Sequence, residues 1–278
     1  MNETTDPVKR LTMNDSPSSV PPHFLKLKRG TSDFIAYHRL VKKDKGFPEV
    51  LFLGGFNSDM SGTKATFLGS ICEQKNQTYT RFDYFGHGFS SGVFTQGTIG
   101  QWLSDTLAMI DEVTKGPLIL VGSSMGGWLM ILAALARPER IKALVGIASA
   151  PDFTEELIWA SLNENQRKDF MRQGIIQTPS QYEEQGFPIT LQLIEEGREH
   201  LVLPRSLDIH CPVHLIHGAA DQDVPWTFSQ RLAQRIKSPE VTLTLIKNGD
   251  HRLNSRLALG RLASFLSELI DEQTLTMN

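Results

Sequence analysis

Ser124 stands at the centre of a pattern that is typical of a nucleophilic serine. It lies in Gly122-Ser123-Ser124-Met125-Gly126, between the apolar run 118–121 and an apolar helical pattern over 125–136. A buried strand, a sharp turn and a helix form the context in which a Gly-x-Ser-x-Gly motif presents its hydroxyl above a sheet. We therefore expect Ser124 to be the nucleophile. Ser123 precedes the apex of the turn and is not expected to react.

A serine nucleophile requires a general base and an acid that orients this base. Asp221 follows the strand-like run 213–217, and His251 follows the last strand-like run, 241–246. The chain order Ser, Asp, His matches that of strand–turn–helix serine sites. Because parallel strands place their functional loops at their carboxyl ends, we expect the three side chains to meet there. His251 is then the base and Asp221 the acid.

Other acids and histidines compete for these roles. Asp223 lies where the chain turns into the next helix, and Asp250 is expected to hold its own turn by accepting a backbone N–H. His217 is expected to brace the loop that carries Asp221. No metal site is expected, because alternation along the strand places His217 on the opposite face from His210 and His214.

A tetrahedral oxyanion needs backbone N–H donors. The residue after the nucleophile begins the helix, so Met125 is expected to supply one donor. The second is expected from Phe56, which follows Gly54-Gly55 at the end of an apolar strand-like run. Glycines at this point let the backbone approach a substrate.

Strand-like and helix-like patterns alternate along most of the chain, which predicts a parallel sheet with helices on both faces. The fold class is therefore α/β, doubly wound with a mostly parallel sheet. The expected strands cover 24–28, 34–38, 49–53, 79–83, 118–121, 141–148, 213–217 and 241–246, and the expected helices 63–74, 99–113, 125–136, 227–236 and 257–269.

The alternation stops over 151–207, where polar-faced helical stretches carry several aromatic residues. This segment is expected to be an inserted helical cap, with Trp159 and Phe170 lining a substrate pocket. Residues 1–22 are rich in Pro, Ser, Asn and Thr, which is typical of a disordered tail. The globular domain is then expected over 23–278.

Composition excludes several classes of partner. The formal net charge is only -3, and no basic block suggests nucleic acid. No apolar run is long enough for stable membrane insertion. Cys72 and Cys211 have no paired spacing and are expected to be buried thiols. These features, with a tail that contains acidic residues, favour a cytoplasmic location.

Several short motifs resemble the branch of α/β-hydrolase-domain serine hydrolases that includes a mitochondrial palmitoyl-protein thioesterase and acyl-glucuronide esterase. The resemblance extends from about Phe24 to the last helix. It is carried by the segments 122–130, 136–139, 81–84, 62–65, 224–226 and 250–252. It implies an α/β-hydrolase fold, no cofactor, and hydrolysis of acyl thioesters or carboxylic esters, with an S-acylated protein among the candidate substrates.

Two alternatives stay open at this point. One is a ligand-binding homologue without catalysis, although binding alone would not need a complete Ser, Asp and His set. The other is acyl transfer or another reaction on Ser124. Acyl chain length and oligomeric state are not encoded in these patterns.

Overall fold

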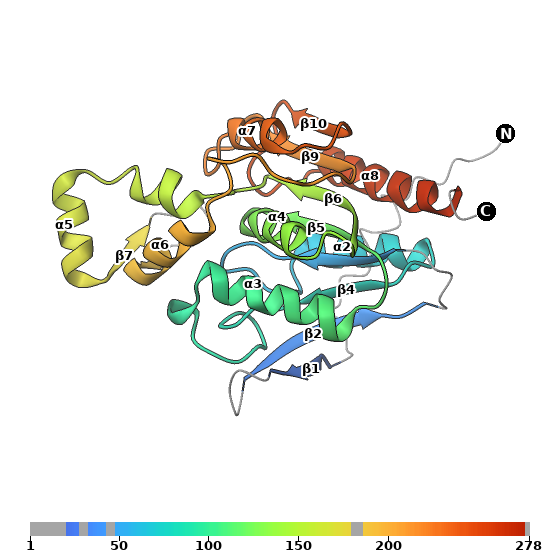
Figure 1. Cartoon of the computed structure of the whole chain (residues 1–278), viewed down its shortest axis with the longest axis horizontal. Coiled ribbons are helices and arrows are strands. Elements are labelled where there is room, and N and C mark those ends of the chain that lie inside the picture. Colours follow the sequence, from blue (N-terminus) through green and yellow to red (C-terminus); the bar gives the residue numbers. More distant parts are fainter. Residues whose placement is uncertain (1–20, 28–32, 43–47, 179–185, 276–278) are drawn as a thin grey trace.

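The computed structural model describes residues 21–27, 33–42, 48–178 and 186–275. Residues 1–20, most of the expected tail, lie outside this range. The described residues contain an eight-stranded sheet (Figure 1). In spatial order its strands are β1 (His23–Lys26), β2 (Phe34–Leu40), β4 (Tyr79–Phe82), β3 (Glu49–Leu53), β5 (Leu118–Ser123), β6 (Ile141–Ile147), β9 (Val213–Gly218) and β10 (Val241–Ile246).

The six strands from β4 to β10 are mutually parallel, whereas β2 pairs antiparallel with both β1 and β4. From β3, the chain first moves outward to β4 and then returns to β5 on the other side of β3. Leu53 lies opposite Gly122 in the register of β3 and β5. The loops that follow these strands therefore leave the sheet side by side, at the point where the strand order reverses. Such a switch point is where open α/β sheets place their ligands.

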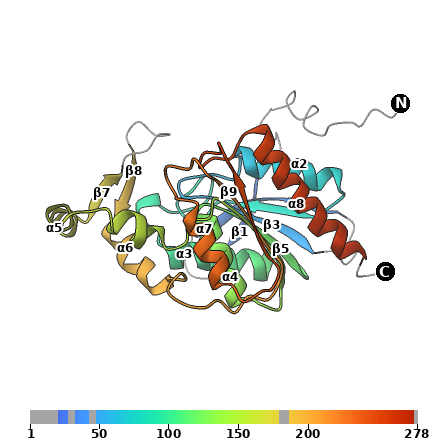
Figure 2. The ribbon, with the colours of Figure 1, turned by 90° about the horizontal axis from the view of Figure 1, so that it is seen from above.

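Helices cover both faces of the sheet (Figure 2). One face packs against α2 (Thr63–Gln74) and α8 (Arg256–Leu275). The other packs against α3 (Ile99–Ala108), α4 (Met125–Ala136) and α7 (Thr227–Arg235). The central strand β5 is buried on both faces: Leu118 and Leu120 join one core, and Ile119 and Val121 join the other. This explains why β5 is a continuous apolar run.

Within the segment 151–207, residues 154–178 and 186–200 lie to one side of the large sheet (Figure 1). Besides helices it contains an antiparallel hairpin of β7 and β8, which the sequence patterns do not predict. Its elements are η3 (Thr154–Trp159), α5 (Glu164–Gln173), β7 (Ile175–Thr178), β8 (Phe187–Thr190), α6 (Leu191–Gly197) and η4 (Arg198–His200).

A buried carboxylate ties the two ends of this segment together. Asp152 accepts hydrogen bonds from the backbone N–H groups of Val202 (2.9 Å) and Leu203 (2.8 Å). Nearby, the N–H of Ala150 donates to the carbonyl of Ser124 (3.1 Å). The base of the segment is thus fixed next to the residue expected to react.

Candidate active site

Ser124 occupies a strained turn between β5 and α4. Its φ of 55° lies in the left-handed region, which few residues other than glycine adopt. Its N–H donates to the carbonyl of Ile147 (2.9 Å), and its carbonyl accepts from Gly127 (2.8 Å). A Cβ atom on Gly122 would collide with the Gly126 backbone, and one on Gly126 would collide with Leu53. The glycines around the serine are therefore required by close backbone packing.

Ser124, His251 and Asp221 form one chain of hydrogen bonds. His251 Nδ1 lies 2.7 Å from Asp221 Oδ2, and His251 Nε2 lies 3.0 Å from Ser124 Oγ. A carboxylate only accepts, so Nδ1 carries the proton of the neutral imidazole and donates it. The Nε2 lone pair then accepts from the Ser124 hydroxyl. This tautomer is the one that removes a proton from the serine.

Asp221 is held as an anion by its surroundings. Oδ2 also lies 3.1 Å from His217 Nε2, and Oδ1 accepts from the N–H groups of Asp223 (2.9 Å) and Val224 (2.9 Å). Burial raises the pKa of Asp221, but the hydrogen bonds from His217 and His251 outweigh it and hold this pKa well below its usual range. The acid is therefore ionised at neutral pH.

His217 is fully buried behind Asp221 and braces the acid loop, as predicted. Its Nε2 contacts Asp221 and the carbonyl of Val224 (2.9 Å), both of which accept. Nε2 therefore carries a proton, and Nδ1 accepts from the Ser229 hydroxyl (2.7 Å). The ring holds the loop through Asp221 and the carbonyl of Val224, while His251 contacts the same carboxylate oxygen of Asp221.

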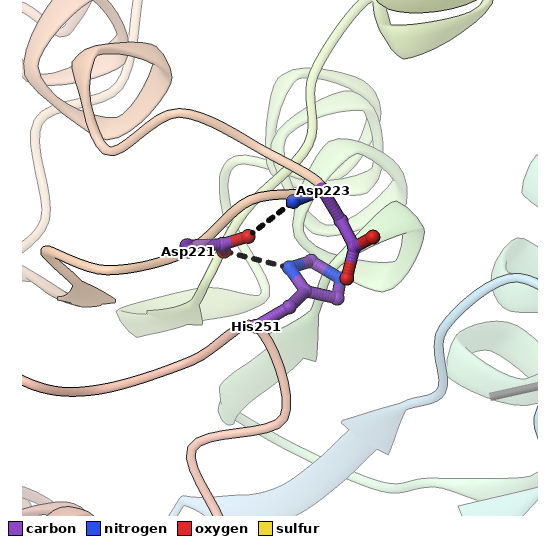
Figure 3. A group of neighbouring side chains, drawn as sticks. All are labelled: Asp221, Asp223 and His251. Carbon is purple, nitrogen blue, oxygen red and sulfur yellow. Dashed lines mark hydrogen bonds and ion pairs between the residues drawn. The ribbon is translucent and has the colours of Figure 1, made fainter. Parts of the chain in front are cut away.

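The other two aspartates near His251 have different surroundings. Figure 3 shows the carboxylate of Asp223 on the far side of the imidazole ring from Asp221. Asp221, Asp223 and His251 offer ligand atoms within 4.8 Å of one another, as a cation site would. Both nitrogens of His251 are already engaged by Asp221 and Ser124. Asp250 accepts the N–H of Leu253 (2.9 Å), which confirms its predicted role in the turn.

The two residues expected to stabilise an oxyanion lie beside Ser124. Met125 is the first residue of α4, and a Cβ atom on Gly55 would lie 3.4 Å from the Ser124 Cβ. The backbone that leads into Phe56 therefore approaches the serine closely. Within the described residues, no backbone carbonyl accepts the N–H of Phe56 or Met125. Their role as oxyanion donors stays a prediction.

An aromatic cluster around Phe56 is not predictable from the sequence patterns. The ring of Phe56 lies 4.9 Å from Phe94, 5.8 Å from Trp102, 5.7 Å from Phe153 and 6.0 Å from Phe187. Two of these rings belong to the segment 151–207 and two to the core domain. They are far apart in the chain, so only the folded structure brings them together.

Trp159 and Phe170 lie within the segment 151–207, with ring centroids 6.3 Å apart. The guanidinium groups of Arg167 (5.2 Å) and Arg198 (4.8 Å) both lie over the indole ring of Trp159, while Phe170 is fully buried. Among the described residues, neither ring contacts that of Phe56, so the structure does not join them to the aromatic cluster. Their role in substrate binding stays a prediction.

The chain belongs to the alpha/beta hydrolase family, whose profile matches residues 50–258, and it is a hydrolase enzyme. It is 40% identical over 247 residues to the mitochondrial palmitoyl-protein thioesterase ABHD10 of Mus musculus, covering 88% of this chain and 82% of the relative. The Homo sapiens protein of the same name is 37% identical over 245 residues, covering 88% and 79%. The solved structure of mouse alpha/beta hydrolase domain-containing protein 10 matches with a TM-score of 0.84 and 38% identity, over 91% of this chain and 99% of that one. The resemblance noted in the sequence is thereby confirmed.

These relatives correct one expectation. The cytoplasmic location inferred from the sequence is wrong, because the similar proteins are named as mitochondrial. Cys72 is buried, as expected, whereas Cys211 is partly exposed, so the expectation of a buried thiol is wrong for Cys211. Unpaired thiols are compatible with any reducing compartment and therefore do not distinguish the cytoplasm. Separately, no helix among the described residues combines the length and apolar character that a bilayer crossing requires.

Proposed function

We propose that this enzyme hydrolyses acyl thioesters and carboxylic esters, with long-chain S-acyl groups on proteins as the preferred substrate class. The observation that carries the proposal is the hydrogen-bonded chain from Ser124 through His251 to Asp221, at 3.0 Å and 2.7 Å. The names of the similar proteins support the thioester preference.

The reaction begins when Ser124 attacks the acyl carbonyl. His251 Nε2 takes the hydroxyl proton, and Asp221 stabilises the resulting imidazolium through Nδ1. The N–H groups of Phe56 and Met125 bind the tetrahedral oxyanion. Collapse of this intermediate breaks the C–S or C–O bond of the substrate, and the imidazolium protonates the leaving thiolate or alkoxide. The product of this half-reaction is an acyl ester of Ser124.

Water completes the cycle. His251 accepts a proton from a water molecule as the water attacks the acyl-enzyme, and then returns this proton to Ser124 Oγ as the carboxylic acid leaves. A thiolate is a good leaving group, so thioesters place little demand on protonation during the first step. The same groups therefore serve both substrate classes.

The acyl chain packs against the aromatic cluster in this proposal. Phe56, Phe94 and Phe187 are half-buried, so each keeps ring surface that a chain can cover. The N–H of Phe56 is itself one of the proposed oxyanion donors, and Gly55 before it lies against Ser124, which places this surface within reach of the reacting carbonyl. Burying each CH₂ group contributes about 0.8 kcal/mol.

The proposal is tested by steady-state hydrolysis of matched acyl thioesters, p-nitrophenyl esters and S-acyl peptides of graded chain length. We expect kcat/KM to rise with chain length and to be highest for S-acyl peptides. A protein that binds these compounds without turnover would show that it is a ligand-binding homologue. Transfer of the acyl group to an added amine or alcohol in preference to water would show an acyltransferase.

The dependence of activity on acyl chain length also distinguishes the aromatic cluster around Phe56 from the pair formed by Trp159 and Phe170. Replacing Phe187 with Ala is expected to reduce activity on long acyl chains by roughly 10-fold or more while changing activity on an acetyl ester little, because only a long chain reaches the ring. Trp159→Ala tests the sequence prediction in the same assay. Equal losses on short and long substrates would contradict a binding role for the replaced residue.

Phe170→Ala provides a stability comparison for these variants. Since Phe170 is fully buried, its removal is expected to lower the free energy of unfolding by about 3 to 5 kcal/mol. Thermal denaturation measures this loss. A change of less than about 1 kcal/mol would contradict the packing role that the structure gives this ring.

A further inference from the structure

The loop that carries His251 has a strained conformation that depends on its contacts. Leu253 has a φ of 49° although it is buried and not glycine. The N–H of Ala220, in the loop that carries Asp221, donates to the carbonyl of Gly249 in the His251 loop (3.0 Å). Asp250 closes the turn by accepting the N–H of Leu253. Non-glycine residues in this region persist only where their surroundings hold them.

Lys64 contacts this loop from a different part of the fold. It lies in the first turn of α2, and its Nζ donates to the carbonyl of Arg252 (2.7 Å), the residue after His251. Burial and the nearby Arg252 guanidinium lower the pKa of Lys64 to about 8, against the opposing effect of Asp250. The ammonium is therefore mostly protonated at neutral pH. A charged donor at this distance makes a strong hydrogen bond.

The position of Lys64 links two parts of the site. The helix α2 directly follows the loop that contains Gly55 and Phe56, whose backbone lies beside Ser124. We propose that Lys64 is a positioning residue: its bond to Arg252 holds the His251 loop in register with the loop that binds the oxyanion. This inference depends on the proposed function.

Loss of this bond acts through His251. The imidazole must keep Nε2 on Ser124 Oγ while Nδ1 stays on Asp221, and a displacement of about 1 Å can cost up to about 10²-fold in rate. Lys64→Met keeps the length and the apolar stem of the side chain but removes the donor. We expect it to lower kcat and the fluorophosphonate labelling rate by roughly 10- to 100-fold, with KM changed by less than about twofold.

The experiment compares Lys64→Met, Lys64→Arg and a control, using kcat and KM for a short-chain ester, the labelling rate and thermal denaturation. Lys75→Met is the matched control, since Lys75 lies just after the same helix and pairs with Asp271 (2.8 Å). Lys64→Arg keeps a charged donor and is expected to recover activity to within about threefold of wild type, while Lys75→Met is expected to match wild type.

Four outcomes would overturn the inference. The first is a kcat of Lys64→Met within about twofold of wild type, and the second is a kcat of Lys64→Arg as low as that of Lys64→Met at normal thermal stability. The third is a rise in KM in place of a fall in kcat. The fourth is a loss of kcat that merely follows a lowered thermal stability. An inactive, unlabelled wild-type protein would instead refute the proposed function, and this inference would fall with it. An active wild type beside an unimpaired Lys64→Met would refute only the role of Lys64.

Discussion

Replacing Ser124 with alanine is expected to abolish covalent labelling by a fluorophosphonate and to lower kcat by roughly 10⁴- to 10⁶-fold. The physical reason is that this hydroxyl donates to His251 Nε2, and His251 is itself oriented by the buried carboxylate of Asp221. Without the nucleophile, the oxyanion donors and His251 retain only weak catalysis by water. Gel-based labelling and steady-state hydrolysis of a p-nitrophenyl ester measure the two effects.

Ser123→Ala is the matched control for this experiment. Ser123 is the adjacent serine, but it is the last residue of β5 and is almost completely buried. We expect the Ser123 variant to keep its labelling and most of its activity. Labelling that persists in the Ser124 variant at normal stability would contradict the assignment of the nucleophile.

Asp221→Asn is expected to lower kcat by roughly 10²- to 10⁴-fold while the fold is preserved. An asparagine amide neither stabilises the imidazolium that forms on His251 nor enforces the Nδ1–H tautomer. The hydrogen bonds from His217 and from the Asp223 and Val224 N–H groups would also meet a neutral side chain. Comparison of kcat at matched thermal stability measures the effect.

Asp223→Asn is the natural comparison, because the Asp223 carboxylate lies on the other side of the same imidazole (Figure 3). It is exposed and does not contact Nδ1, so we expect a loss much smaller than that of Asp221→Asn. The reverse order, with Asp223→Asn inactive and Asp221→Asn near wild type, would require Asp223 to be the acid.

The sequence predicts the fold well wherever one periodicity dominates. The helix bounds expected for 63–74 and 125–136 agree with α2 and α4, and the strand 241–246 agrees with β10. Continuous apolar runs such as β5 are unambiguous because both faces are buried. The hairpin of β7 and β8 is different: its strands have four residues each, too few for a clear alternation.

The residues of the candidate site likewise form two groups, one that the sequence predicts and one that it does not. Ser124, Asp221 and His251 stand at strand ends within motifs that have a structural context, so sequence alone suggests that they meet. Lys64 and the rings around Phe56 carry no such context. A lysine at the start of a helix and scattered phenylalanines become informative only when the fold places them next to the reacting groups.

The cytoplasmic location was predicted wrongly, and this error also has a physical reason. Composition, cysteine usage included, is shared by proteins of several reducing compartments. It carries no information that separates the cytoplasm from another reducing compartment. The names of the similar proteins supply what composition lacks.

Direct detection of the acyl-enzyme tests the central claim most directly. Wild-type protein is mixed with a palmitoyl thioester, quenched in acid within the first turnover, digested and examined by mass spectrometry. We expect a palmitoyl ester on Ser124, formed before the free acid appears and increased in amount in a variant with slow deacylation. Turnover with no acyl group on Ser124, or with the acyl group on another residue of the chain, would contradict the account.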